Sequence, residues 1–205
     1  MAWLETMRRR AAQFGPRLYW ELRDRLSRPE RVLESQVVKF RVLFVCFGNI
    51  CRSPLAEEIF RQKVARVGLG RLVAVDSAGT SADNIGKRPF WQARACAARH
   101  GLTLGHPRAR LFTPADFRSF DRILVMDQHN RDEVLRLAPA PGNATHVHLL
   151  LEFAGGGEIR DPMGGEAADF ERVFHQIEAA CEALVAHVAG EVARGTGTMA
   201  VPAPQ

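Results

Sequence analysis

Short apolar segments alternate with stretches of helical periodicity along most of this chain. The apolar segments lie at 41–45, 72–75, 121–126 and 145–151, and a helical stretch follows each of them. Strands that alternate with helices form a parallel sheet with helices packed on both faces. The 205 residues are enough for one such domain to bury roughly 70% of its unfolded surface. The sequence therefore predicts an α/β fold with an open, mostly four-stranded parallel sheet and helices on both faces.

The first apolar segment leads directly into the segment 45–54, which reads Val-Cys-Phe-Gly-Asn-Ile-Cys-Arg-Ser-Pro. Gly48 and Asn49 can bend the backbone tightly, and Pro54 suits the first turn of a helix. Backbone N–H groups in such a bend, beside a helix N-terminus, attract anions. We therefore expect a phosphate-binding loop at the C-terminal end of the first strand, formed by Phe47, Gly48, Asn49, Ile50, Cys51, Arg52 and Ser53.

Cys46 stands at the start of this loop, and Arg52 and Ser53 follow at its far end. The loop amides, Arg52 and the Ser53 hydroxyl would stabilise a thiolate on Cys46, which could then attack phosphorus and form a phosphocysteine. The guanidinium of Arg52 could also hold two oxygens of the transferring phosphoryl group. Isolated cysteines are more often small core residues, but that role does not explain the fixed pattern downstream. The loop has no Lys, which disfavours nucleotide hydrolysis.

A further candidate for catalysis lies in the glycine-rich segment 155–165, between an apolar strand and a long helix. Pro162 disfavours helix at Asp161 and holds that carboxylate on an extended loop. There Asp161 could protonate the leaving oxygen as a general acid and later activate water as a base. Asp-Pro pairs also commonly begin turns. In combination with Cys46 and Arg52, the sequence favours the general-acid role.

These segments make the chain similar to the low-molecular-weight protein tyrosine phosphatases, from about Lys39 to about His187. The loop at 45–54 is the most specific marker. Weaker markers occur in the family's order, at Asp76-Ser77-Ala78-Gly79-Thr80, Arg108-Ala109-Arg110, Met126-Asp127 and Asp161-Pro162.

The resemblance implies a role for each matching residue. Cys46 would be the nucleophile, Arg52 would bind phosphate, and Asp161 would be the general acid. A supporting hydrogen-bond net would come from Asn49, Ser53 and Ser77. The implied reaction is the metal-independent hydrolysis of phosphotyrosine in proteins through a phosphocysteine, with no metal or organic cofactor and with a tyrosine kinase as a possible partner.

Three departures from the family pattern concern the substrate pocket. The segment 81–87 has no aromatic residue, and Met163 follows Asp161-Pro162 where many relatives have tyrosines. Pro107 takes the place of the family's usual histidine, which displaces His106 by one position. The resemblance therefore predicts the type of reaction more firmly than the substrate.

Three other functions stay open on the same fold. Arsenate reductases that share the loop use two further cysteines close together in sequence, whereas Cys96 and Cys181 are widely separated here. Arginine-phosphate phosphatases tend to have Thr where this chain has Ile50. A non-catalytic module that binds phosphate or phosphoproteins would need the loop but not Asp161.

The cysteines and the hydropathy pattern favour the cytoplasm. Four cysteines, one of them needed as a thiolate, fit a reducing compartment. No apolar run approaches the roughly 18 residues of a membrane span, and the start lacks an apolar signal core. Cys51 and Cys46 share one curved loop, so they could form a reversible disulfide that protects the nucleophile. Cys51 could equally well be a packed core residue.

The excess positive charge lies at the start of the chain. Through Lys39 there are nine Lys and Arg against five Asp and Glu, out of a net charge of +5 for the whole chain. We expect residues 1–38 to be a basic amphipathic helical extension, which either contacts an anionic membrane or a partner, or packs on its own domain or dimerises. The phosphatase-like domain would span 39–190, and 191–205 would be a disordered tail. The seven histidines show no metal-ligand spacing with Cys or carboxylates, and no nucleic-acid motif is present.

Overall fold

The computed structural model describes residues 38–105 and 108–195. Most of the predicted extension, His106, Pro107 and the end of the predicted tail lie outside the described residues, so the predictions made for them stay predictions. No helix within the described residues is long and apolar enough to cross a membrane.

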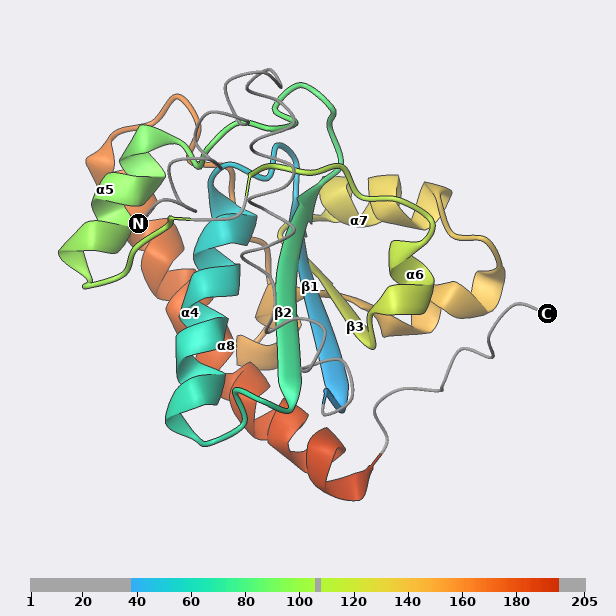
Figure 1. Cartoon of the computed structure of the whole chain (residues 1–205). Coiled ribbons are helices and arrows are strands. Elements are labelled where there is room, and N and C mark those ends of the chain that lie inside the picture. Colours follow the sequence, from blue (N-terminus) through green and yellow to red (C-terminus); the bar gives the residue numbers. More distant parts are fainter. Residues whose placement is uncertain (1–37, 106–107, 196–205) are drawn as a thin grey trace, which may run out of the picture. The chain divides into compact units, whose positions relative to one another are not determined.

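A four-stranded sheet forms the centre of the domain (Figure 1). Its strands lie in the order β2-β1-β3-β4, and every pairing between neighbours is parallel. Their bounds are β1 (Phe40–Cys46), β2 (Val73–Gly79), β3 (Arg122–Val125) and β4 (Val147–Leu149). The prediction of an open, parallel, four-stranded sheet is confirmed. The fourth strand is shorter than its apolar segment, because only Val147–Leu149 pair with β3 and the flanking residues form 3₁₀ turns, η1 (Pro141–His146) and η2 (Leu150–Ala154).

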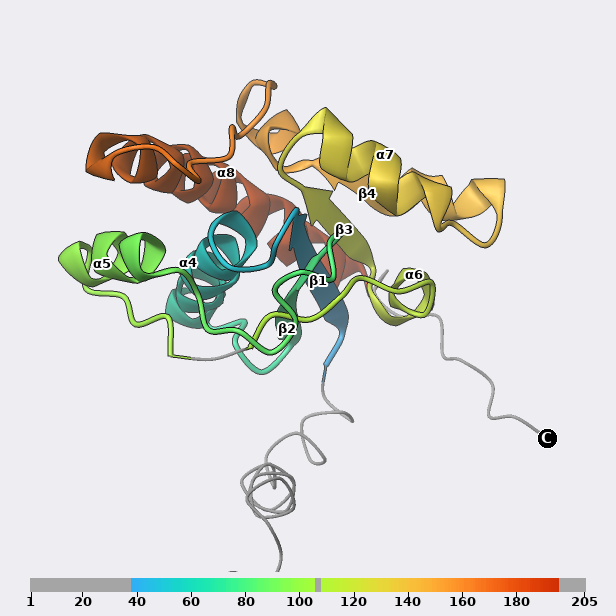
Figure 2. The same ribbon diagram turned by 90° about the horizontal axis from the view of Figure 1, so that it is seen from above.

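Helices cover both faces of the sheet, as Figure 2 shows. One face carries α4 (Arg52–Arg66), α5 (Trp91–Arg99) and α8 (Ala167–Arg194). The other carries α6 (Asp116–Ser119) and α7 (Gln128–Arg136).

Residues of β1 alternate between the two resulting cores. Val42 and Phe44 pack in the core under α4 and α8, whereas Leu43 and Val45 pack in the opposite core with Phe117. A strand buried on both faces is apolar along its buried length, which is why the residues from Val42 to Cys46 read as a continuous apolar run, whereas Arg41 is only partly buried.

The topology determines where a ligand can bind. From β1 the chain passes through α4 to β2 on one side, and it later crosses to β3 on the other side of β1. In open parallel sheets, ligands bind beyond the carboxyl ends of the strands where the order reverses in this way. Cys46 is the last residue of β1, so the predicted phosphate loop begins at this point.

The last helix extends into the segment 191–205 that was predicted to be a disordered tail. Glu166 and Asp169 form a capping box at the start of α8, and the helix continues to Arg194. Gly195 ends it in the left-handed conformation, with φ of 70°. Residues 191–194 are therefore helical, and residues 196–205 lie outside the described part of the chain.

Candidate active site

The segment after β1 folds into a tight loop that ends at the N-terminus of α4. Asn49 has a φ of 52°, the left-handed conformation that Asn tolerates better than most residues. The carbonyl oxygens of Cys46, Phe47 and Ile50 accept hydrogen bonds from backbone N–H groups outside the loop, those of Thr80, Ser81 and Phe90. With these carbonyls held by neighbouring segments, the loop has its N–H side free to surround an anion.

Cys46 is buried at the base of this loop. Its Sγ accepts a hydrogen bond from the Asn49 N–H at 3.3 Å and lies 3.1 Å from the Ser53 hydroxyl. A thiolate can only accept hydrogen bonds, so an ionised Cys46 would receive the Ser53 proton as well. Two polar groups of the loop therefore converge on the sulfur.

The three residues predicted to support the loop contact one another. The Asn49 side-chain amide donates to Ser53 Oγ and to Ser77 Oγ, both at 2.9 Å. The Asn49 carbonyl oxygen accepts from the Arg110 backbone N–H at 2.9 Å. Every polar group of the Asn49 amide is therefore used to fix the loop.

Glu57 on α4 extends this network, and sequence reasoning missed it. Ser77 Oγ donates to Glu57 Oε2 at 2.6 Å, and Arg61 pairs with the other oxygen. Burial raises the pKa of Glu57, against the opposing effects of Arg61 and Ser77. The signal available in the sequence was a Glu within an otherwise buried first half of a helix.

Arg52 is only 1% exposed, and it is held by acceptors from two distant segments. Its Nη1 donates to Asp127 Oδ2 and to the Ile159 carbonyl, and its Nη2 donates to Asp161 Oδ2 at 2.6 Å. Burial works against its charge, but Cys46, Asp161 and Asp127 together raise the pKa of Arg52. Its Nε is buried and has no hydrogen-bond partner among the described residues, which leaves one donor of the guanidinium for a bound anion.

Asp127 is the second residue that sequence reasoning did not assign a role. It follows β3 at the same sheet edge as Cys46. One oxygen caps α7 by accepting the Asn130 N–H at 2.7 Å, while the other accepts from Arg52. Its place directly after an apolar strand was a usable signal, because carboxyl ends of parallel strands meet at one edge.

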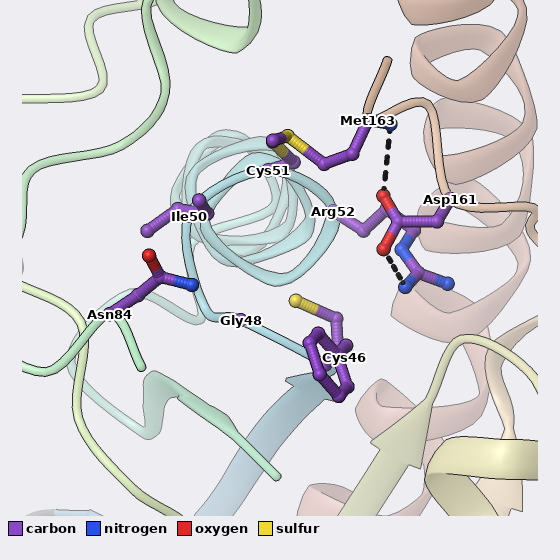
Figure 3. Close-up of a pocket in the computed structure, with 9 residues that line it drawn as sticks. Cys46, Gly48, Ile50, Cys51, Arg52, Asn84, Asp161 and Met163 are labelled. Carbon is purple, nitrogen blue, oxygen red and sulfur yellow. Dashed lines mark hydrogen bonds and ion pairs between the residues drawn. The ribbon is translucent and has the colours of Figure 1, made fainter. Parts of the chain in front are cut away.

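Cys46, Arg52 and Asp161 line one cavity of about 370 Å³, shown in Figure 3. The remaining lining comes from Phe47, Gly48, Ile50, Cys51, Asn84 and Met163. The Asp161 carboxylate faces Arg52 with one oxygen and accepts the Met163 N–H at 3.1 Å with the other. The structure thus brings Asp161, from a distant segment of the chain, to the loop that carries Cys46 and Arg52.

The walls of the cavity have an unusual composition. Asn84 lies on the segment after β2, and Met163 lies on the loop that carries Asp161, so both flanks lack aromatic side chains. The exposed aromatic residue at the cavity is Phe47, which is 42% exposed and tilted against His129 with ring centroids 6.4 Å apart. Phe47 was predicted only as part of the phosphate loop, because an apolar side chain after Cys46 gives no hint of its direction.

Cys51 shares the cavity but differs chemically from Cys46. Its Sγ lies 3.4 Å from the Met163 sulfur, and it is buried. Burial, followed by the charges of Cys46 and Asp161, strongly raises the pKa of Cys51. The Cys51 thiol is therefore protonated at neutral pH.

Comparison with known proteins shows to which protein family this chain is related. The family model of low molecular weight phosphotyrosine protein phosphatases matches residues 41–194. A low molecular weight protein-tyrosine-phosphatase of Streptomyces coelicolor is 40% identical over 158 residues, which cover 75% of this chain and 96% of that protein. This chain belongs to the low molecular weight phosphotyrosine protein phosphatase family. The resemblance expected from the sequence is confirmed.

Solved structures of this phosphatase family share the fold. A protein tyrosine phosphatase from Entamoeba histolytica matches with a TM-score of 0.71 at 30% identity, covering 75% of this chain and 99% of that one. A Drosophila arginine phosphatase matches with a TM-score of 0.67 at 33% identity, covering 72% and 96%. The family match runs from β1 into the end of α8, so the whole cavity lies inside it.

Proposed function

We propose that this protein is a phosphomonoesterase that hydrolyses phosphotyrosine in proteins through a phosphocysteine intermediate, without a metal. The observation that carries the proposal is the meeting of Cys46, Arg52 and Asp161 in one cavity. A pure phosphate-binding module would need the first two but not the third. Membership of the phosphatase family supports the same reaction.

In the first step the phosphate of the substrate lies in the loop, against the N–H groups and Arg52. The Cys46 thiolate attacks phosphorus, a sulfur–phosphorus bond forms, and the bond from phosphorus to the tyrosine oxygen breaks. Asp161, in its protonated form, gives that leaving oxygen a proton. Before this step the phosphate has to compete with Asp161 for Nη2 of Arg52, because the two are paired in the free protein.

In the second step water attacks the phosphocysteine. Asp161, now a carboxylate, takes a proton from the water, and the sulfur–phosphorus bond breaks to return the Cys46 thiolate and inorganic phosphate. The hydrogen bonds from Asn49 and Ser53 make Cys46 a good leaving group, because they stabilise the thiolate that departs.

The walls of the cavity bear on the class of substrate. Phe47, Ile50 and Met163 offer apolar surface to a phenyl ring, and Ile50 stands where arginine-phosphate phosphatases tend to have Thr. The likeness to a Drosophila arginine phosphatase keeps phosphoarginine as the second candidate. Peptides that carry phosphotyrosine or phosphoarginine, compared by kcat/KM, distinguish the two substrates.

One experiment tests the reaction itself. The full chain should hydrolyse an aryl phosphate in the presence of a chelator, and phosphate, arsenate or vanadate should inhibit it competitively. Cys46→Ser should abolish turnover, whereas Cys181→Ser, a buried thiol on α8, should retain it. Loss of turnover on chelation, or normal turnover by Cys46→Ser, would contradict the mechanism. Phosphate binding without hydrolysis would indicate the binding module, and thiol-dependent arsenate reduction would indicate the reductase.

We also propose that Cys51 protects Cys46 from irreversible oxidation. Peroxide would convert Cys46 to a sulfenic acid, and Cys51 would displace water from it to form a disulfide that a thiol reductant reopens. Both sulfurs line the same cavity (Figure 3). After peroxide treatment, reductant should restore turnover to the wild type but not to Cys51→Ser. Equal recovery of both proteins would contradict this role.

For the cellular setting, we propose a cytoplasmic protein that acts on the products of a tyrosine kinase. The charge of residues 1–38 supports a contact with an anionic membrane surface or a partner. Separation of cell fractions, with the protein detected in each, tests the location.

A further inference from the structure

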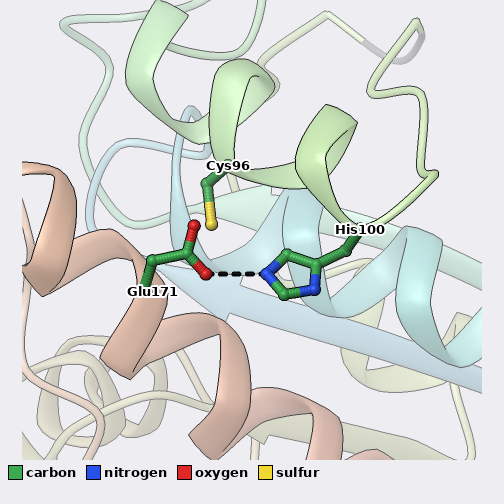
Figure 4. A group of neighbouring side chains, drawn as sticks. All are labelled: Cys96, His100 and Glu171. Carbon is green, nitrogen blue, oxygen red and sulfur yellow. Dashed lines mark hydrogen bonds and ion pairs between the residues drawn. The ribbon is translucent and has the colours of Figure 1, made fainter.

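Two helices on one face of the sheet bring three potential metal ligands together. α5 contributes Cys96 and, just beyond its end, His100, and α8 contributes Glu171. One ligand atom from each residue lies within 4.8 Å of the other two, and Figure 4 shows the three side chains converging. None of the three lines the cavity that holds Cys46.

We propose that Cys96, His100 and Glu171 form a binding site for a transition-metal ion such as Zn²⁺, separate from the phosphatase cavity.

The mixture of ligand types selects the class of metal. A thiolate, an imidazole and a carboxylate together suit Zn²⁺ and similar ions, whereas Ca²⁺ and Mg²⁺ require mostly oxygen ligands. In tetrahedral Zn²⁺ sites the ligand atoms lie about 3.5 Å apart, given metal–ligand bonds of about 2.0–2.3 Å. The ligand atoms here all lie within 4.8 Å of one another, and a bound ion would widen the 2.7 Å contact between His100 Nε2 and Glu171 Oε2. Zn²⁺ would displace the thiol proton of Cys96 into solvent, and the fourth position would be open to water.

The surroundings already orient the ligands. The His100 ring stacks on Phe174 with centroids 3.8 Å apart, and its Nε2 lies 2.7 Å from Glu171 Oε2. Arg99 holds the other carboxylate oxygen, Oε1, at 2.6 Å, so a metal bound at Oε2 would take the place of the direct contact between Oε2 and His100. Such outer contacts fix the orientation of metal ligands and raise affinity. Cys96 is fully buried beneath them, while His100 and Glu171 are partly exposed, so an ion can enter from solvent.

A nucleophile–histidine–acid triad is the alternative interpretation of the same three residue types. In such a triad the imidazole stands between the nucleophile and the acid. Here the Glu171 carboxylate contacts the imidazole with one oxygen, and the thiol lies at that carboxylate rather than at the ring (Figure 4). Because the imidazole does not stand between the thiol and the carboxylate, the geometry fits ligation better than covalent catalysis.

The expectation that no histidine has metal-ligand spacing is corrected here. Cys96 and His100 are one helical turn apart, a spacing that places two side chains on one face. The third ligand comes from α8, which the sequence alone does not place against α5.

A Zn²⁺ titration of the full chain tests the site. Cys46 and Cys51 are replaced by Ser in every protein so that the cavity thiols cannot bind metal, and a chelating indicator competes for the ion. The proposal expects one equivalent of Zn²⁺ bound and a rise in Tm. Cys96→Ala and His100→Gln should each weaken binding by at least about 10-fold, the lower bound for disturbing a metal site. Cys181→Ala, a buried thiol elsewhere on α8, should bind as the parent does.

Co²⁺ in place of Zn²⁺ reports thiolate ligation directly, because the cobalt–thiolate bond gives a charge-transfer absorption. That absorption should appear in the parent and in Cys181→Ala and be lost in Cys96→Ala. The absorption requires a cobalt–thiolate bond, so its presence in the parent, in which Cys46 and Cys51 are replaced, shows that a remaining thiolate holds the metal. Absence of Zn²⁺ binding by the parent, or equal binding by Cys96→Ala, would overturn the proposal and leave the cluster as an ion pair.

Discussion

Arg52 is the residue on which the active site depends most. Asp127, Ile159 and Asp161 hold its guanidinium from segments more than seventy positions away, and its Nε stays without a partner among the described residues. A buried guanidinium held at several points is pre-organised to receive a phosphoryl group in one orientation. The sequence predicted Arg52 because the loop pattern is local. It could not predict Asp127 as its partner, because that contact depends on the pairing of β1 with β3.

Asp127→Asn tests this hold on Arg52. The amide can still cap α7 at the Asn130 N–H, since Asn is as good a cap as Asp, but it removes the charge opposite Arg52. A hydrogen bond to a charged group is worth about 1.5–3 kcal/mol, so kcat/KM for an aryl phosphate should fall by about 10- to 100-fold. Vanadate inhibition should weaken in parallel, and Tm should fall as well, because Arg52 is buried and loses a charged partner. An unchanged kcat/KM would show that Arg52 is held well enough without this carboxylate.

Asp161→Asn tests the general acid. Only a basic leaving oxygen needs the proton, so kcat for phenyl phosphate should fall by about 10²–10⁴-fold, with a much smaller loss for an activated nitrophenyl ester. Asp83→Asn, on the exposed segment after β2, serves as the control and should affect neither substrate. If both esters lost activity equally, Asp161 would act through Arg52 and not through a proton.

Among the elements, β2 packs closely against the phosphate loop at Gly79. A Cβ at this position would lie 2.8 Å from the Phe47 carbonyl oxygen and 3.0 Å from the Asn49 nitrogen, both backbone atoms of the loop. The sequence marked Gly79 only as part of a family pattern. The reason for the glycine is visible once β2 pairs with β1, because Cys46 and Gly79 are then register partners.

Gly79→Ala should therefore impair the loop. The backbone atoms that a Cβ meets cannot rotate away, and overpacking of this kind costs about 1–3 kcal/mol. If the whole cost falls on the active loop, turnover of an aryl phosphate should decrease by about 5- to 150-fold, and Tm should decrease too. Gly142→Ala is the matched control, because a Cβ there meets nothing within 4 Å. Normal turnover by Gly79→Ala would show that the loop can shift without loss of its geometry.

The contacts of Asp169 at the start of α8 lead us to expect that the stability of the protein depends on pH. Arg172 and the Glu166 backbone N–H lower the pKa of Asp169 below its ordinary value of 3.8. A carboxyl whose pKa is lowered by folding stabilises the folded state above its ordinary pKa, and this stabilisation is lost as the pH falls through the lowered value. At pH 7 the wild type should unfold at a higher urea concentration than Asp169→Asn. The difference between the two urea midpoints should become smaller below about pH 4. If the difference between the two urea midpoints did not change with pH, the charge of Asp169 would be excluded as its cause.

For the molecule as a whole, sequence reasoning succeeded where the signal is local and failed where it needs the topology. The apolar runs gave the strands, and the segment 45–54 gave the loop and the start of α4. Glu57 joins the loop through Ser77 on another strand, and Cys96 meets Glu171 only when α5 packs on α8. The periodicity of the sequence does not predict such contacts. Each one joins side chains from two different elements, and those elements come together only in the folded protein.

The last prediction concerns residues 1–38, which the family match at 41–194 does not include. They contain Arg8-Arg9-Arg10 together with apolar residues at a spacing that predicts one helical face, namely Trp3, Leu4, Met7, Ala11 and Phe14. If the extension contacts membranes, the full chain should co-sediment with anionic vesicles but not with neutral ones, and deletion of 1–38 should abolish this while aryl phosphate turnover stays within a few-fold.

A triple replacement of Arg8, Arg9 and Arg10 by Gln isolates the charge. Each basic residue near an anionic surface contributes about 1 kcal/mol, so the three together should change vesicle partition by about 100-fold. Turnover should be unaffected, because every residue assigned to the cavity lies beyond Lys39. Equal co-sedimentation of all three proteins would exclude the membrane contact and favour packing on this domain or self-association. A truncated protein that folds but does not turn over substrate would show instead that catalysis requires residues 1–38.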